Sequence, residues 1–296
     1  MLEFNQVPGD EERYLQGFGG DTSNFCIAAA RQGGRVGYLT RLGRDAFGRH
    51  FLELWQRERV DTRGVGLDSE AHTGIYFVTH TAAGHVFTYF RASSAASRIR
   101  PEDLALDLIE STRYLHVSGI SQAISDSACD AVFFAIEQAR KAGAKISYDP
   151  NLRLKLWPLA RARAIIEATI ALTDYFLPSL EDARALTGLD DPERIAEYFL
   201  ARGAKAIALK LGADGALLVT KNESFRIKGH TVSVVDATGA GDCFDGALIA
   251  RLDAGDDFVD ASLYANAAAA LAITGFGAVA PIPYSDAVHS LLKTTA

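Results

Sequence analysis

The stretch that decides the fold is VVDATGAGDCFDGALIARL, residues 234–252. It follows strand-like residues, so that VSVV (232–235) runs into a glycine-rich turn and then into an apolar segment. Within that segment Phe244, Leu248 and Leu252 recur at helical spacing. The pattern predicts a strand, a tight turn and a helix in succession, with the glycines at the start of the helix.

The turn brings together the chemistry of an anion site. Gly239, Ala240 and Gly241 would lie at the helix N-terminus, where backbone N–H groups have no partner within the helix and the helix dipole is positive. Such a terminus is suited to phosphate. Asp242 falls in the first turn of the same helix, where a carboxylate serves either as a cap or as a reacting group.

A second glycine-rich stretch, GFGGDTSN (17–24), precedes the alanine-rich run FCIAAARQGG. Glycines allow backbone conformations closed to other residues and let a ligand approach the chain closely. The stretch also suits an ordinary loop followed by a helix capped by Thr22 or Ser23. We keep both interpretations open at this point.

Strand-like and helical segments alternate through the middle of the chain. This alternation is typical of a mainly parallel sheet covered by helices. The predicted strands are 114–121, 145–151, 174–179, 204–212 and 215–220, and a helix is predicted over 125–144, with Asp126 or Ser127 near its start.

One section, HTGIYFVTHTAAGHVFTYFR (72–91), has a different pattern. Two alternating runs of β-branched and aromatic residues flank TAAG, which predicts a β-hairpin with no helix to cover it. Such a hairpin would form a lid or a partner surface. The alternative is an antiparallel edge of the main sheet.

Composition limits the class of protein. The chain has 296 residues, 48% of them hydrophobic, with a net charge of −7, so we expect a large packed core and neither nucleic acid nor membrane as a partner. Three scattered cysteines, Cys26, Cys129 and Cys243, suit buried thiols in a reducing compartment. No signal peptide or membrane-spanning run is evident, so we expect a cytoplasmic protein, and the seven scattered histidines predict no metal site.

The segments GGDTSN and DATGAGDCFDGAL resemble the two signature regions of the ribokinase-like (PfkB-type) sugar kinases. With FTYFRASSAAS, SGISQAIS and DPNLRLKLW, the chain is most similar to the members that act on 2-keto-3-deoxygluconate, a sugar acid. The resemblance implies one domain over 1–296, a three-layer α/β/α fold with a mainly parallel sheet, and a small β lid with strands within 1–17 and 73–91. It further implies ATP, Mg²⁺, γ-phosphoryl transfer to the sugar's 6-hydroxyl, and a homo-oligomer such as a dimer through the lid.

The resemblance also implies roles for individual residues. Asp242 would accept the hydroxyl proton, and Gly239, Ala240 and Gly241 would stabilise charge on the phosphoryl group. The residues that would hold the sugar are Gly19, Gly20, Asp21, Asn24, Tyr76, Tyr89, Arg91 and Arg153. The residues that would lie against the nucleotide are Ser179, Lys210, Gly212, Gly215, Asn266, Gly239 and Gly241.

The arginines give a physical reason to prefer an acidic sugar. Tyr89 and Arg91 lie two apart on a predicted strand and share a face, and Arg153 follows the end of another strand. The planar fork of arginine matches a carboxylate with two parallel hydrogen bonds. Alternatively, Arg91 is a solvated lid residue and Arg153 is a surface cation or faces the phosphates.

The sequence departs from the family pattern in two places. Many members carry Asn-x-x-Glu, a motif tied to Mg²⁺, where this chain has Ser179 and Asp182, so the metal contacts are left unassigned. The family also has a complete strand before its first lid strand, of which we expect only MLEF (1–4) to be present. We expect such a loss to leave backbone groups and apolar surface unpaired. For Asn266, a purely structural role within its alanine-rich helix is an alternative.

Three other functions compete with a sugar-acid kinase. A related enzyme that phosphorylates a neutral sugar, such as a fructokinase or ribokinase, would use the same motifs. A catalytically silent sugar-binding protein would not need Asp242. A dinucleotide-dependent oxidoreductase would need G-x-G-x-x-G after the first strand, which is absent, as is the P-loop motif.

Overall fold

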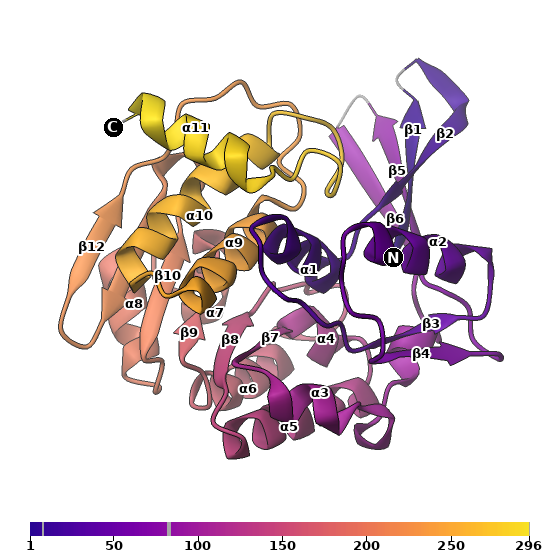
Figure 1. The fold of residues 1–296 in the computed structure, drawn as a ribbon, viewed down its shortest axis with the longest axis horizontal. Helices are drawn as coiled ribbons and strands as arrows, with labels where there is room; N and C mark the ends of the chain where they lie inside the picture. The colour runs from indigo at the N-terminus through magenta and orange to yellow at the C-terminus, as the bar shows by residue number, and fades with distance from the viewer. Residues whose placement is uncertain (8, 82–83, 296) are drawn as a thin grey trace.

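The computed structural model describes residues 1–7, 9–81 and 84–295, and its centre is a six-stranded sheet (Figure 1). The strands from β7 to β10 are parallel, and β11 and β12 continue the sheet antiparallel. In spatial order they are β12 (Ser224–Ile227), β11 (Ala216–Thr220), β10 (Ala206–Lys210), β9 (Tyr175–Phe176), β8 (Lys145–Asp149) and β7 (Tyr114–Ser118).

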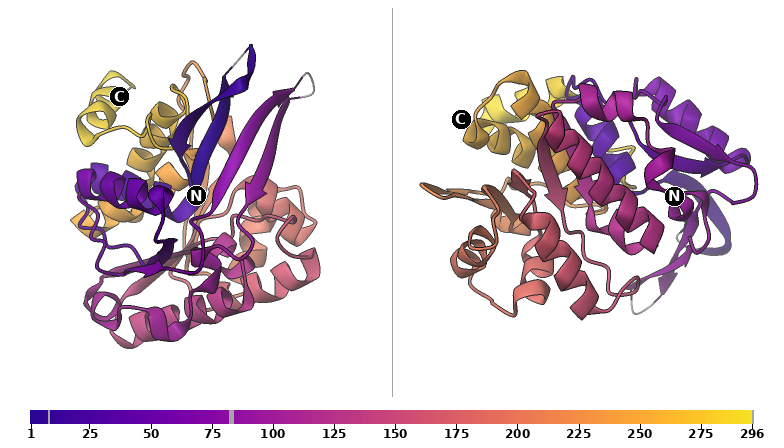
Figure 2. Two further views of the ribbon diagram at one scale, coloured as in Figure 1. Left: turned by 90° about the vertical axis from the view of Figure 1, so that its right-hand side faces the viewer. Right: turned by 90° about the horizontal axis from the view of Figure 1, so that it is seen from below.

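Helices cover both faces of this sheet and enclose two separate cores (Figures 1 and 2). Strand β10 shows the division, because Ala208 belongs to one core while Ile207 and Leu209 belong to the other. The first core includes α1 (Asp21–Arg31), α2 (Ala46–Arg57), α9 (Ala240–Ala254), α10 (Phe258–Ala272) and α11 (Ser285–Thr295). The second includes α3 (Leu106–Ser111), α5 (Asp126–Lys141), α6 (Leu159–Ile170), α7 (Leu180–Thr187) and α8 (Pro192–Leu200). This arrangement confirms the predicted three-layer α/β/α fold.

Four strands form a separate sheet that projects from this body (Figures 1 and 2). Their spatial order is β2 (Asp10–Phe18), β1 (Leu2–Val7), β5 (Ile75–Thr81) and β6 (Gly84–Phe90). The outer pairs are antiparallel and the central pair, β1 with β5, is parallel. The predicted lid is therefore confirmed, and the alternative of an edge on the main sheet is wrong. Two residues of the expected TAAG turn, 82 and 83, lie outside the described residues.

The remaining elements are short segments between the larger ones. They are the parallel pair β3 (Thr40–Gly43) and β4 (Val65–Asp68), the short helix α4 (Gly119–Ala123), and the 3₁₀ turns η1 (Ala95–Arg98), η2 (Pro101–Asp103) and η3 (Gly212–Asp214).

A groove of about 1080 Å³ separates β7 from the segment that leads into β3. Within the described residues β7 pairs only with β8, so its other edge faces this groove. Apolar side chains make up much of the wall, among them Leu39, Ile109, Tyr114, Val117, Ile120, Ala131 and Ala135. Residues 2–4, expected to be the remainder of a core strand, instead belong to lid strand β1.

Most predicted elements are present but shorter than the sequence indicated. Strand β7 ends at Ser118, where α4 begins, and the strand predicted over 174–179 is reduced to Tyr175–Phe176. Helix α5 (Asp126–Lys141) is capped by Ser125, the first residue of the predicted range. The strand predicted at 232–235 is wrong, because Val234 is 61% exposed and no described strand lies beside this segment. Val235 N and the following Asp236 N both donate to the Ile273 carbonyl, at 2.8 and 3.3 Å.

Candidate active site

Helix α9 begins as the sequence predicts. Gly239 takes a left-handed conformation with φ of 78°, and the helix starts at Ala240. A side chain at Gly239 would crowd the Ala278 carbonyl, so glycine is needed at this turn. The amides of Gly241 and Asp242 lie in the first turn, where no intrahelical acceptor exists. The helix terminus therefore offers unpaired donors to an anion.

Asp242 is not the cap of this helix. Its Oδ2 accepts a hydrogen bond of 2.8 Å from Asn24 Nδ2 on α1. Burial, followed by the negative charge of Asp21, raises the pKa of Asp242 to about 7. A carboxylate with this pKa accepts a proton near neutral pH more readily than an ordinary aspartate does.

The glycine-rich stretch positions α1 against Asp242. Gly20 precedes the helix with φ of 116°, a conformation that favours glycine, and a side chain at Gly19 would collide with the Tyr76 hydroxyl. Neither expected cap acts as one, because Thr22 Oγ1 bonds to the Tyr38 hydroxyl and Ser23 Oγ accepts from Trp55 Nε1. The interpretation of this stretch as an ordinary loop with a Thr22 or Ser23 cap is therefore wrong.

Two polar side chains at the start of α1 face the same region as Asp242. Asp21 accepts a short hydrogen bond from the hydroxyl of Ser118 at the end of β7. Asn24 is 3% exposed, and its Oδ1 has no hydrogen-bond partner within the described residues. A buried acceptor without a partner is costly, so Asn24 Oδ1 is ready to accept from a ligand hydroxyl.

A buried ionic cluster lies behind the anion site. Lys210, at the end of β10, places Nζ 3.1 Å from Asp149 Oδ2 and 3.0 Å from Asp245 Oδ2. Asp149 ends β8, and Asp245 lies one turn after Asp242 on α9. The lysine thus ties two strands of the sheet to the helix that carries Asp242.

The inner face of the lid brings two tyrosines toward the glycine-rich stretch. Tyr76 on β5 pairs in register with Tyr89 on β6, and their ring centroids lie 5.8 Å apart. Tyr76 is buried, and its hydroxyl donates a short hydrogen bond to Glu3 on β1. The expected sugar-binding face therefore includes Glu3, which the sequence did not indicate.

Arg91 and Arg153 come from different elements, and Arg91 is half-buried while Arg153 is exposed. Arg91 follows the lid strand β6, and its guanidinium lies 6.0 Å from the centroid of the Tyr89 ring. Burial lowers the pKa of Arg91, the nearby Asp21 and Tyr89 act to raise it, and the positive charge of Arg153 acts to lower it. Among the described residues neither arginine forms an ion pair, and Arg153 donates only to the carbonyl of Leu152. Two guanidinium groups without an ion pair suit the binding of negative charge.

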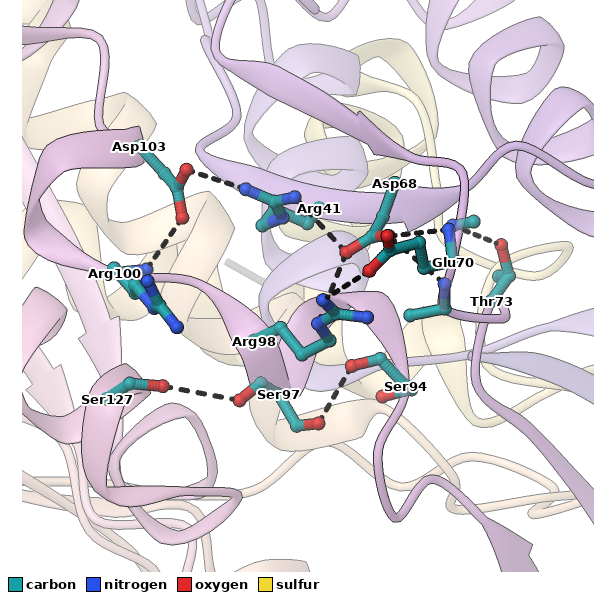
Figure 3. Close-up of polar contacts among 12 residues, drawn as sticks. Arg41, Asp68, Glu70, Thr73, Ser94, Ser97, Arg98, Arg100, Asp103 and Ser127 are labelled. Carbon is teal, nitrogen blue, oxygen red and sulfur yellow. Dashed lines mark hydrogen bonds and ion pairs between the residues drawn. The ribbon is translucent and has the colours of Figure 1, made fainter.

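A network of polar contacts fixes the segment that returns from the lid to the body (Figure 3). Arg41 bridges Asp68 and Asp103, at 3.1 and 2.6 Å, and Arg98 reaches both Asp68 and Glu70. Further along the segment, Ser97 donates to the Ser94 carbonyl and accepts from Ser127 through its own carbonyl. These contacts anchor residues 94–103 and so hold the neighbouring Arg91 in place.

Asp182 is the residue best suited to a divalent metal. Burial and the nearby charge of Asp149 raise the pKa of Asp182 to about 6, and no described cation forms an ion pair with it. Its Oδ2 accepts from Leu152 N. No group of three metal-ligating side chains occurs within residues 1–7, 9–81 and 84–295, so a magnesium ion here would draw its other ligands from water and nucleotide phosphates. Ser179 caps α7 by accepting from Asp182 N.

The remaining predicted nucleotide residues lie in one turn and on helix α10. Gly212 and Gly215 have positive φ angles of 62° and 90° in the turn between β10 and β11. A side chain at Gly215 would collide with the Ile227 carbonyl. Asn266 donates 2.9 Å to the Lys228 carbonyl, which is the structural contact considered as its alternative role.

The structure adds residues that the motifs did not reveal. Ser118, Asp149 and Asp245 contact predicted site residues, yet none was selected from the sequence. A partial signal existed for Asp149, which ends a strand in the segment DPN, and for Asp245, which lies three residues after Asp242. The sequence did not indicate that either aspartate contacts Lys210.

Comparison with known proteins gives consistent results over the whole chain. A model of the pfkB family of carbohydrate kinases matches residues 2–284. The 2-dehydro-3-deoxygluconokinase of Bacillus subtilis (strain 168) is 34% identical over 299 residues, spanning 99% of this chain and 92% of that protein. The probable fructokinase-4 of Arabidopsis thaliana is also 34% identical, spanning 96% and 90%. An Escherichia coli structure that holds ATP and Mg²⁺ is 28% identical, with a TM-score of 0.90 over 99% of this chain and 96% of that chain.

Proposed function

This chain belongs to the pfkB family of carbohydrate kinases, and we propose that its substrate is 2-keto-3-deoxygluconate, phosphorylated on the 6-hydroxyl. The observation that carries the proposal is that the positive charges of Arg91 and Arg153 act on each other, while neither arginine forms an ion pair with a described carboxylate. A substrate carboxylate would offset their mutual repulsion and form charge-assisted hydrogen bonds. A neutral sugar would do neither.

Asp242 acts as the base in this proposal. Its carboxylate, oriented by Asn24, accepts the proton of the sugar hydroxyl as the oxygen attacks the γ-phosphorus of ATP. The P–O bond to the leaving ADP breaks as the new P–O bond forms. The amides at the start of α9 then stabilise the charge on the phosphoryl oxygens.

The other proposed contacts divide between the sugar, which accepts the phosphoryl group, and the nucleotide, which donates it. Gly19, Gly20, Asp21 and Asn24 hold the sugar hydroxyls, with Tyr76 and Tyr89 covering them from the lid. The turn of Gly212 and Gly215 and the helix residue Asn266 border the nucleotide. Family members use ATP and a divalent metal ion, and the bound metal neutralises phosphate charge. In this chain Asp182 is the residue that we propose would hold the metal ion.

A fructokinase is the second candidate. The observation that favours it is the equal identity, 34%, of a probable fructokinase and a 2-dehydro-3-deoxygluconokinase to this chain. The pair of unmatched arginines favours the acid. Membership in a kinase family does not support a silent sugar-binding protein or an oxidoreductase.

The experiment that tests the proposal is a coupled ADP-release assay over a panel of sugars. We expect 2-keto-3-deoxygluconate to give a higher kcat/KM than fructose or ribose, by at least tenfold. A preference for either neutral sugar would contradict the carboxylate argument and leave the arginines to serve the phosphates or the lid.

Three further points belong to this proposal. We place residues 1–296 in one kinase domain. We place the protein in the cytoplasm, because all three cysteines are free and buried, which suits a reducing compartment. In the described part of the chain no helix is long and apolar enough to cross a membrane. We also propose a homodimer through the outer face of the lid, where the rings of Phe4, Tyr14, Phe77 and Phe90 contact one another.

A further inference from the structure

Lys210 is nearly enclosed, although its motif predicts a residue that faces the nucleotide. Its side chain is 12% exposed, and the carboxylates of Asp149 and Asp245 beside it are 7% and 1% exposed. Nζ makes contacts of 3.1 Å to Asp149 Oδ2 and of 3.1 and 3.0 Å to the two oxygens of Asp245. An ammonium has three N–H donors, so these contacts leave none for a phosphate.

The cluster contains two acids and one base in a buried place. One ammonium balances only one of the two carboxylates that it contacts, so burial favours a proton on the other. The ammonium holds the pKa of Asp149 below its ordinary value, whereas burial and the charge of Asp149 raise the pKa of Asp245 well above it. The positive charge of Lys210 thus compensates the negative charge of Asp149.

This compensated pair lies directly behind the anion site. A Cβ atom added to Gly241 would lie 3.3 Å from Lys210 Nζ, so the ammonium touches the residue that precedes Asp242. Charges that act on Asp242 come from each element packed around its helix start. They are Asp21 from α1, Asp149 from β8 and Lys210 from β10. On α9 itself, Asp245 contacts Lys210, while burial and the charge of Asp242 raise the pKa of Cys243 and so keep that thiol neutral.

The sign of each influence is clear. Asp21 and Asp149 favour the protonated form of Asp242, as does burial, while Lys210 and the hydrogen bond from Asn24 favour the ionised form. Lys210 is the cation among these groups. Without Lys210, the uncompensated charge of Asp149 would favour the protonated form of Asp242. That form cannot accept the proton of a hydroxyl.

We propose that Lys210 is a positioning residue whose ammonium, fixed between Asp149 and Asp245 behind Gly241, offsets the charge of Asp149 and keeps Asp242 ionised for proton acceptance. The inference deepens the proposed function, because it rests on Asp242 being the base. It assigns Lys210 a role through Asp242 in place of contact with the nucleotide phosphates.

The test is a ¹³C-carboxyl NMR titration of Asp242 in the ligand-free protein, paired with the pH profile of kcat/KM on a sugar that the wild type turns over. In Lys210→Met we expect the midpoint of Asp242 to rise by about one pH unit, which corresponds to about a tenfold lower kcat/KM below the midpoint. The two enzymes should converge at high pH. Lys210→Arg keeps the charge and should shift the midpoint much less.

Two further variants separate charge from packing. Lys210→Gln removes the charge but retains a hydrogen-bond donor for Asp149, so it should reproduce the shift even where Lys210→Met does not fold. The double variant Lys210→Met with Asp149→Asn removes both opposite charges, and its midpoint should return close to that of the wild type.

Other outcomes would overturn the proposal. An unmoved midpoint with a raised KM for ATP would make Lys210 a phosphate ligand, and an unmoved midpoint with only a lower melting temperature would make it structural. The titration needs no substrate, so a wild type that phosphorylates fructose would contradict the proposed sugar and leave the role of Lys210 intact.

Discussion

At the scale of single residues, Asp242 carries the sharpest prediction. Asp242→Asn keeps the shape of the side chain and the hydrogen bond from Asn24, but it cannot accept a proton. We expect kcat to fall by a factor of about 10² to 10⁴. Calorimetry should find the affinities for sugar and ATP within a few-fold of the wild type. Near-normal turnover would reduce Asp242 to a structural residue.

The same substitution should also change how stability depends on pH. The folded protein raises the pKa of Asp242 to about 7 from an ordinary value of 3.8, so the folded state binds a proton more tightly than the unfolded chain. Stability from this residue is therefore complete below about pH 4 and is lost as the pH rises through 7. Denaturant unfolding should show Asp242→Asn gaining roughly 2–4 kcal/mol over the wild type at pH 8 and almost nothing at pH 4. A gain that does not vary with pH would contradict the assignment.

Arg153 tests the choice of substrate. Arg153→Ala removes half of the unmatched pair, so the KM for the sugar acid should rise about thirtyfold, or roughly 2 kcal/mol. The KM for ATP should stay within twofold, and Arg153→Lys should restore only part because a point charge lacks the guanidinium fork. A neutral sugar provides the control, since its poor turnover should not worsen in parallel. An equal effect on ATP would place Arg153 at the phosphates.

The conformation and position of a site residue could be predicted from the sequence where they depend only on adjacent residues of one motif. The turn at Gly239 and the first-turn position of Asp242 follow from adjacent residues, and the structure shows both. The contacts of Lys210 with Asp149 and Asp245 join positions 61 and 35 residues apart, and no local pattern contains them. The bond between Ser118 and Asp21 spans 97 residues and was likewise invisible.

At the scale of elements, the periodicity of apolar residues predicted whether a segment is a helix or a strand better than it predicted where the segment begins and ends. Helix α5 and strands β7, β8, β10 and β11 all lie within their predicted ranges, because each buries an apolar face in one core or in both. The segment 232–235 has the β-branched composition of a strand but finds no partner strand among the described residues. Strand composition alone is therefore insufficient, since pairing depends on what lies alongside.

The groove beside β7 leads to a prediction about α5. Ala131 lines the groove, so Ala131→Leu would fill empty apolar space and should raise stability by up to about 1 kcal/mol, or about 2 °C in Tm. Calorimetric melting measures the change.

Ala139 on the same helix is the matched control. It is fully buried in the second core and does not line the groove, so Ala139→Leu should overpack and cost about 1–3 kcal/mol. Equal losses in the two variants would show that the groove near Ala131 closes in solution.

At the scale of the whole molecule, the outer face of the lid predicts assembly. Phe90 is 52% exposed beside Phe77, an aromatic surface that a second copy would cover. We expect light scattering to give a dimer for the wild type and a monomer for Phe90→Asp. Leu263 on α10 is also exposed and lies outside the lid, so Leu263→Asp should leave the dimer intact. A monomeric wild type would contradict the proposal.

The parallel pairing of β1 with β5 has a consequence for how the chain reaches this structure. Each half of the lid is a local hairpin, β1 with β2 and β5 with β6, and hairpins close within microseconds. The seam between them joins Leu2 to Ile75, across the intervening β3, α2 and β4. Sequence-distant contacts of this kind slow folding because loop entropy is lost before they form. The face of the lid that carries Glu3 and Tyr76 spans this seam, so it acquires its shape only when two distant parts of the chain have come together.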